Sequence, residues 1–232
     1  MFTNIQICLL FGFFMGVIEY YKPYIYKKIP SVPIIHHIIV CIIINNMLIN
    51  DTFDLCMITT ITQSELKPMY VYTSLLSCTY GYFDLYITIK KNESKDLLLH
   101  GLFFSIGSTF VLYNNIVHWL LPFLLFETSS LFLNLLCIHD YVKYLFFIAF
   151  IFYRNILYPI LFSYWVYHNE KLFMYEYNHE KVYFIFNILF GILNFYWGYK
   201  LIKKAIKTIK QKNENKIKQN KTKQKLKKIE KN

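Results

Sequence analysis

VKYLFFIAFIFYRNILYPILFSYWVY, residues 142–167, is an almost continuous apolar run with one arginine, Arg154, near its middle. A helix of about 20 apolar residues crosses the roughly 30 Å hydrocarbon core of a bilayer. Only helices and closed barrels satisfy their backbone polar groups in lipid, and the chain lacks the alternating strands of roughly ten residues that build a membrane barrel. The stretch therefore predicts a transmembrane helix with a charged side chain inside it.

Similar apolar runs fill most of the chain, of which 56% is hydrophobic and 20% aromatic. The predicted spans cover roughly residues 4–20, 32–50, 69–89, 97–113, 116–136, 142–167 and 182–202. A soluble core of this size does not need runs of that length. The sequence thus predicts an all-α polytopic membrane protein with about seven transmembrane helices.

The basic residues are unevenly placed, which predicts how the spans are oriented. The formal charge is +11, and 14 of the 24 lysines lie between Lys200 and Lys231. Lysines concentrate in cytosolic loops. With the N-terminus lumenal or outside, the cytosolic loops hold Lys22, Lys27, Lys28, Lys90, Lys91, Lys95 and Lys143, against Lys67, Lys171 and Lys181 on the other side. This bias predicts a cytosolic C-terminus.

The first span and the C-terminal tail each allow a prediction about how the chain meets the membrane. No basic residue precedes the first span and no small-residue cleavage site is present, whereas Lys22, Lys27 and Lys28 follow the span, which is therefore interpreted as an uncleaved anchor rather than a signal peptide. The Lys-rich tail, residues 208–232, has two interpretations that remain open. It is either a basic helix on an anionic leaflet or a solvated, disordered segment that only sets topology.

Several classes of site have no support in the sequence. The five cysteines show no paired spacing, so neither a disulfide nor a metal site is expected. No Gly-rich phosphate loop, nucleophile elbow or nucleic-acid motif occurs. We therefore expect no cofactor and no nucleic-acid partner.

Two opposite charges lie within predicted spans, Glu127 in the fifth and Arg154 in the sixth. A charge at the centre of a membrane helix costs at least about 2.5 to 3.5 kcal/mol. Each therefore needs a partner, a wet cavity or a functional reason. An ion pair between Glu127 and Arg154 is the simplest expectation.

Other ionisable residues lie in the cytosolic halves of the second to fourth spans, namely His36, His37, Asp84 and His100. One interpretation is a shared polar cavity that opens toward the cytosolic leaflet and suits lipid chemistry or lipid binding. The alternative is interhelical hydrogen bonding that fixes the register of the helices.

Six motifs follow one another along these spans: His36; Tyr80 and Asp84 in TYGYFDL; His100 in LLLHG; Glu127, Ser129, Phe132 and Asn134 in ETSSLFLN; Arg154 and Pro159 in YRNILYP; Asn194 and Trp197 in NFYWGYK. In residue type and order they resemble the TLC-domain family, named for its TRAM, Lag and CLN members. The resemblance implies a helical barrel of six spans over residues 32–207. Residues 1–31 would then be an N-terminal transmembrane helix with a cytosolic loop, and residues 208–232 the tail.

The family includes ceramide synthases, regulators of lipid composition and proteins of lipid sensing or transport, largely in the endoplasmic reticulum. The chain departs from the synthase pattern, because Gly101 replaces a second histidine and Trp119, Leu120 and Phe123 stand where a histidine and two aspartates are expected. The resemblance therefore favours a protein of lipid homeostasis in the endoplasmic reticulum that binds, senses or transports membrane lipid. Its lipid-cavity or structural polar residues would be His36, Tyr80, Glu127, Ser129, Asn134, Arg154, Asn194 and Trp197.

The alternative is a lipid N-acyltransferase related to ceramide synthase, with acyl-CoA as a partner. His100 would then be the catalytic base that takes a proton from a lipid amine, and Asp84 the carboxylate that orients it. A seven-helix receptor shares the predicted topology. The last span, however, lacks the Asn-Pro-x-x-Tyr pattern, and no acidic-arginine pair follows the third span, which argues against that class.

Overall fold

A computed structural model of the chain describes residues 3–26, 29–56, 58–59, 61–92, 95–168 and 178–229. Lys27, Lys28 and Lys171, which enter the predicted charge balance, lie outside the described residues. The chain forms two compact units, Met1–Gly191 and Ile192–Asn232. Each unit is described here by itself.

Helices occur in every predicted span. In chain order the elements are α1 (Asn4–Tyr21), β1 (Tyr24–Tyr26), β2 (Ile29–Pro30), α2 (Ser31–Asn50), α3 (Thr52–Cys56), η1 (Gln63–Glu65), α4 (Pro68–Lys90), α5 (Lys95–Tyr113), η2 (Val117–Leu120), α6 (Leu121–Leu124), α7 (Glu127–Asn134), α8 (Val142–Phe150), η3 (Ile151–Leu157), α9 (Tyr158–His168) and α10 (Asn178–Ile229). The short antiparallel pair β1–β2 was not expected from the sequence. In the second unit α10 continues to Ile229, so the Lys-rich segment is helical that far.

Five helical stretches of the described residues are long and apolar enough to cross a membrane: Asn4–Tyr21, Ser31–Asn50, Lys95–Tyr113, Val142–His168 and His179–Gln211. Helix α4 has the length, but serines and threonines are spread along it, among them Thr73, Ser74, Ser77 and Thr79, all of them buried. Its polar content is therefore directed inward. The expected all-α polytopic class is confirmed.

The outer surface of the bundle is apolar, as lipid contact requires. Large hydrophobic side chains stand exposed on several helices, for example Leu9 and Phe13 on α1, Ile42 on α2 and Ile160 on α9. Soluble monomers rarely expose apolar patches larger than a few hundred Å². Together with the length of the helices, this surface indicates an integral membrane protein.

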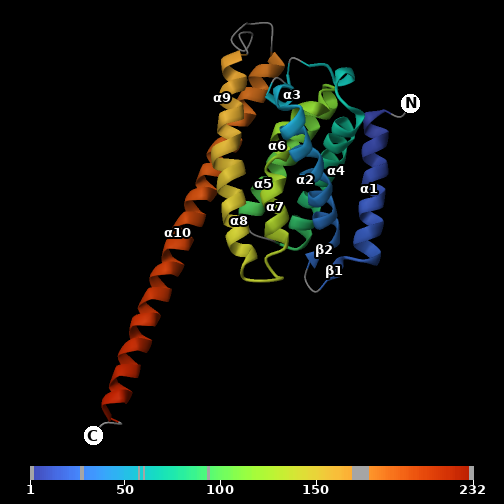
Figure 1. The fold of residues 1–232 in the computed structure, drawn as a ribbon. Helices are drawn as coiled ribbons and strands as arrows, with labels where there is room; N and C mark the ends of the chain where they lie inside the picture. Colours follow the sequence, from blue (N-terminus) through green and yellow to red (C-terminus); the bar gives the residue numbers. More distant parts are fainter. Residues whose placement is uncertain are drawn as a thin grey trace. The chain divides into compact units, whose positions relative to one another are not determined.

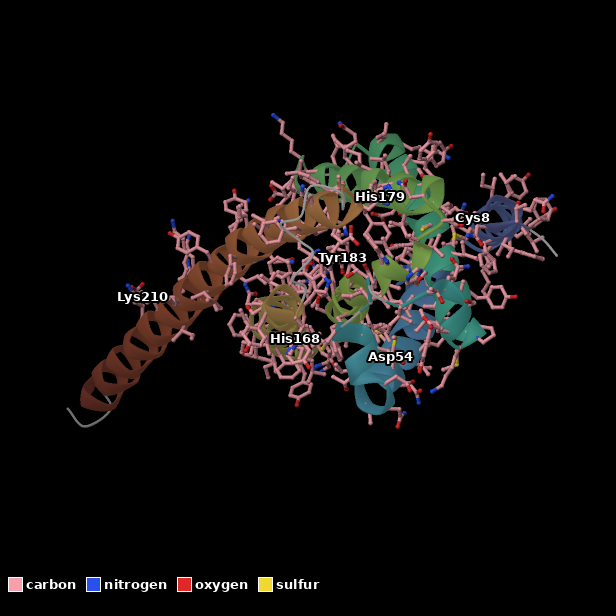
Figure 2. The ribbon with its side chains drawn as sticks, turned by 90° about the horizontal axis from the view of Figure 1, so that it is seen from above. Cys8, Asp54, His168, His179, Tyr183 and Lys210 are labelled. Carbon is pink, nitrogen blue, oxygen red and sulfur yellow. The ribbon has the colours of Figure 1, made fainter. Side chains whose placement is uncertain are left out.

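Helices α2 and α4 form the middle of the first unit. Helix α4 packs against α1, α2 and α5, and α2 also packs against α7 (Figure 1). Cys8 lies on the side of α1 that faces α4 (Figure 2), where the Thr79 hydroxyl donates to the Cys8 carbonyl at 3.2 Å. The first span is thus held to the bundle by a hydrogen bond as well as by apolar packing.

The connection between α2 and α4 folds over one end of this unit. The Asp51 carboxylate accepts hydrogen bonds from Lys67, at 2.6 Å, and from Tyr70. The Lys67 ammonium is the main reason that the pKa of Asp51 lies below its usual value. His118 Nε2 lies 3.0 Å from the carbonyl oxygen of Ile61, so this histidine joins the connection to the start of the fifth span.

The fifth span is interrupted rather than continuous over 116–136. It consists of η2, α6 and α7, with the break at Leu125 and Phe126. Around the break the backbone forms i→i+3 bonds, and the Phe126 carbonyl also accepts from the Ser129 hydroxyl and from Arg154. The Phe126 carbonyl oxygen therefore accepts from these side chains in addition to the backbone N–H groups of Ser129 and Ser130.

The sixth span contains a π-helical segment, η3, between α8 and α9. Pro159 follows it directly and has no backbone N–H to donate. Single π-turns of this kind occur frequently at functional sites. Here the segment carries Arg154, which it directs into the interior.

Two glycines set the close approach of α4 and α5. A Cβ atom on Gly81 would lie 2.2 Å from the Phe104 ring, and one on Gly101 would lie 3.2 Å from the Cα atom of Leu85. Each helix thus provides a glycine on which the other helix rests. At Gly101, the place of the family's second histidine, a large side chain would push α4 and α5 apart.

Gly81→Ala is expected to destabilise the fold. The Phe104 ring must move to admit the methyl group, and overpacking of this kind costs about 1 to 3 kcal/mol. Gly16→Ala on α1 is the matched control, because an added Cβ there has nothing within 4 Å. Thermal unfolding in detergent would measure both variants. Equal melting temperatures for the two would contradict the assigned contact.

Candidate functional site

The centre of the site is a buried contact between α2 and α7. Glu127, the first residue of α7, is 3% exposed, and its Oε2 lies 2.6 Å from Nε2 of His37 on α2. On the other side of the ring, His37 Nδ1 lies 2.7 Å from Asn134 Nδ2. The carboxylate, the imidazole and the carboxamide therefore form one line across the bundle.

The bonds of Asn134 determine which nitrogen of His37 carries the proton. Asn134 Nδ2 also donates to the Ser130 carbonyl oxygen at 3.2 Å, so its amide hydrogens point toward both neighbours. His37 Nδ1 must then accept, and its proton lies on Nε2. A neutral His37 donates that proton to Glu127, which gives the buried carboxylate a strong hydrogen bond.

His36 lies beside this line, in a different environment. Its ring stacks on Tyr80 with centroids 3.9 Å apart, and its Nε2 lies 3.0 Å from the Ser77 hydroxyl oxygen. Its Nδ1 is buried and has no hydrogen-bond partner among the described residues. The Tyr80 hydroxyl in turn donates to Asp84 Oδ1 at 3.3 Å, one turn further along α4.

Arg154 is also buried, 5% exposed, but Glu127 contacts His37 where the sequence analysis expected Arg154. The guanidinium donates from Nε to Ser129 Oγ at 2.8 Å and from Nη2 to Ser130 Oγ at 2.9 Å. Its Cζ atom lies 5.2 Å from the centre of the Phe126 ring and 5.0 Å from that of Phe150. Hydroxyl acceptors and aromatic faces thus take the place of the expected ion pair. On α7 the two serines lie four and five residues before Asn134, and α7 packs against α8.

His100 approaches the cluster from α5. It is within electrostatic range of Arg154, Glu127 and His37. Its ring lies nearly parallel to that of Phe104, one turn along α5, with centroids 6.3 Å apart. The proposed pairing of His100 with Asp84 stays a prediction.

A second polar chain lies next to the first. The Tyr153 hydroxyl donates to Asn45 Oδ1 at 2.7 Å, and Asn45 Nδ2 donates to Thr128 Oγ1 at 3.0 Å. These residues were not singled out from the sequence, because single Asn, Thr and Tyr residues are common in membrane helices. Only their meeting in space distinguishes them.

A small aromatic cavity begins one helical turn after His100 on α5. It lies between α5, the fifth span and the start of α10, and has a volume of about 20 Å³. Its lining residues are Phe103, Phe104, Gly107, Phe110, Val111, Leu120, Phe123, Tyr183, Phe186 and Phe190. Figure 2 shows Tyr183 on the inner side of α10, where its ring meets those of Trp119 and Phe123 at 5.3 and 5.6 Å. The cavity has no polar lining.

Most of the residues selected from the sequence meet in one place. The cluster contains His36, Tyr80, Glu127, Ser129, Asn134 and Arg154, with Asp84 attached through Tyr80 and His100 at its edge. Asn194 and Trp197 lie in the second unit, Ile192–Asn232, and their part in a site stays a prediction. His37 proves central although only its position in the span had been noted, and Ser77 and Ser130 were missed because a serine in a membrane helix carries no distinctive signal.

Comparison with known proteins gives one match. A family model described as the TLC domain matches residues 28–203 of the chain. No curated protein and no solved structure matches it.

The two sides of the central contact are expected to respond differently to substitution. His37→Ala leaves the Glu127 carboxylate buried without its donor, and breaking a buried charged contact in this way costs about 3 to 5 kcal/mol. Glu127→Gln still offers a carbonyl oxygen to His37 Nε2, so its cost should be about 1.5 kcal/mol or less. The free energies of unfolding of the two variants would be measured by titration with a denaturing detergent. A larger loss for Glu127→Gln than for His37→Ala would show that the carboxylate is not held by His37.

Proposed function

The chain belongs to the TLC-domain family, since the family model covers more than half of it, and on that premise we propose that it holds an amphiphilic lipid inside the bundle. The polar end of the lipid lies at His100, Glu127 and Arg154, and its acyl chain lies in the aromatic cavity. By holding and exchanging this lipid, the protein senses or transports it and so affects membrane lipid composition.

One observation carries the proposal: aromatic rings that contact the polar cluster also form or contact the wall of the aromatic cavity. On α5, His100 stacks on Phe104, and Phe104 lines the cavity. On the fifth span, the Phe126 ring lies under Arg154 and 6.2 Å from Phe190, which also lines the cavity. A polar cluster that lies next to an apolar cavity suits a molecule with a polar head and a hydrocarbon tail.

The size of the cavity sets a condition on binding. At about 20 Å³ it has room for little more than one water molecule. An acyl chain therefore enters only when aromatic side chains turn aside. Phe103, Phe110 and Phe186 are only partly buried, and an atom added to Gly107 meets open space, so this wall is the one that can open.

The packing at Gly101 supports a role other than ceramide synthesis. A side chain there would contact the backbone of Leu85, so a second histidine requires α4 and α5 to shift by a few tenths of an ångström. The Glu127 carboxylate is already engaged by His37. His100 thus lacks both the second histidine and the nearby pair of aspartates of the synthase pattern.

A cavity-filling variant tests the proposal. Lipid that co-purifies with the wild type would be identified by mass spectrometry and compared with Gly107→Leu, which adds a side chain at a residue that lines the cavity. We expect a loss of about tenfold or more, which corresponds to about 1.4 kcal/mol of binding. Gly16→Leu is the matched control, because it adds the same side chain where α1 meets open space. Equal amounts of the same lipid in all three proteins would contradict the proposal.

The acyltransferase alternative is decided by turnover. Purified protein would be incubated with labelled acyl-CoA and a sphingoid base, in parallel with His100→Ala. Product formation that is lost in His100→Ala would establish the enzyme and replace a carrier or sensor role. Lipid retention with no product from either protein is the result that the proposal expects.

We place the protein in the endoplasmic reticulum, with the N-terminus lumenal and the Lys-rich helix in the cytosol on an anionic leaflet. The support is the excess of lysine in the loops assigned to the cytosol and between Lys200 and Lys231. Protease added to intact microsomes should remove an epitope fused after Asn232 and spare one fused before Met1. The reverse pattern would invert the assigned topology.

A further inference from the structure

We propose that His36, His37 and Glu127 form a binding site for one divalent transition-metal ion of the zinc type, with three protein ligands and one open position. The sequence analysis expected no metal, since it relied on cysteine spacing. The three residues are two neighbours on α2 and one residue 90 positions later on α7, a pattern that no sequence motif describes.

The geometry brings the three donors together. One ligand atom from each residue lies within 4.8 Å of the other two, and all three side chains are buried. Ligand atoms at the usual zinc distances of about 2.0 to 2.2 Å lie about 3.3 Å apart around a tetrahedral ion. The three ligand atoms therefore have to approach one another by at most about 1.5 Å to reach this spacing.

His36 supplies the most specific observation. The residue is 2% exposed, and its Nδ1 has no hydrogen-bond partner among the described residues. With its proton on Nε2, the ring donates to the Ser77 hydroxyl and leaves a lone pair on Nδ1. A histidine ligand typically donates its other N–H to an oxygen in this way. A buried lone pair with no donor is chemically suited to a metal ion.

His37 can change from its present contact to a metal bond without losing a proton from the cluster. Its proton moves from Nε2 to Nδ1, and the freed Nε2 lone pair binds the ion. Asn134 then turns its carboxamide so that Oδ1 accepts from Nδ1–H, in exchange for its present bond to the Ser130 carbonyl. Glu127 Oε2, now 2.6 Å from Nε2, becomes the third ligand.

The charges around the proposed site favour an anionic oxygen as the fourth ligand. Glu127 neutralises one of the two charges of the ion, and the guanidinium of Arg154 adds another within the same buried region. An anionic oxygen at the open position therefore reduces the excess charge. If the proposed lipid function holds, the phosphate or carboxylate of a lipid head is such an oxygen, whereas hydroxide fills the position in its absence.

The direct test uses tag-free, full-length protein that has been stripped with a chelator and then equilibrated with Zn²⁺. Elemental analysis should find about one zinc per chain. Co²⁺ in its place should give the visible absorption of a four-coordinate site. His36→Gln keeps a polar group near Ser77 but removes the imidazole, and we expect it to lower the affinity for Zn²⁺ by about tenfold or more.

His118→Ala is the matched control, because His118 is also buried with an unpartnered Nδ1 among the described residues but lies at Ile61, outside the cluster. It should bind zinc like the wild type. No bound zinc in the wild type, or equal binding by His36→Gln, would overturn the proposal. Should His36→Gln fail to fold, a rise in the melting temperature of the wild type with Zn²⁺ that is equally large in Glu127→Gln would also overturn it. The amount of bound lipid would be measured in the same samples, so that the two proposals are tested separately. Protein that binds lipid but no zinc would overturn the metal site and leave the lipid proposal standing.

Discussion

The need to satisfy a carboxylate inside a membrane bundle organises this structure. Glu127 is buried at the start of α7, and a neutral His37 donates to it from α2. That bond requires Asn134 to hold the other ring nitrogen, which sets the register between α2 and α7. The hydroxyls of Ser129 and Ser130 on the same helix then accept from Arg154. The break in the fifth span and the π-turn in the sixth both bring these partners within reach.

Because Glu127 and Arg154 find their partners within the cluster, the same residues contribute to stability and to a site. Arg154 is held by hydroxyl groups and aromatic faces, and Glu127 by one imidazole, so neither is locked in an Arg–Glu pair. A lipid head of suitable charge would contact these two groups. The aromatic cavity that follows along α5 gives such a ligand a place for its apolar part.

The sequence predicted the helices well because their signal is local. Apolar length alone placed α1, α2 and α5 within two residues of their observed ends. The interruption at Phe126 was missed; the Phe126 carbonyl oxygen accepts there from Arg154, 28 residues later, and no local pattern shows such a contact. The partner of Glu127 was assigned by charge to Arg154, whereas the helix packing brings His37 closer. The fit of the Phe104 ring onto Gly81 was equally invisible, because no local pattern shows which side chain faces a glycine.

The central claim, one amphiphile site that joins the polar cluster to the aromatic cavity, is tested most directly by photolabelling in a bilayer. A lipid with a photoreactive group in its acyl chain would be irradiated with the protein, and the labelled peptides would be identified by mass spectrometry. The account predicts label on residues 103–111 of α5 and 183–190 of α10. Label confined to outward-facing residues such as Leu9 and Phe13 of α1 would show that the lipid stays outside the bundle and would contradict the account.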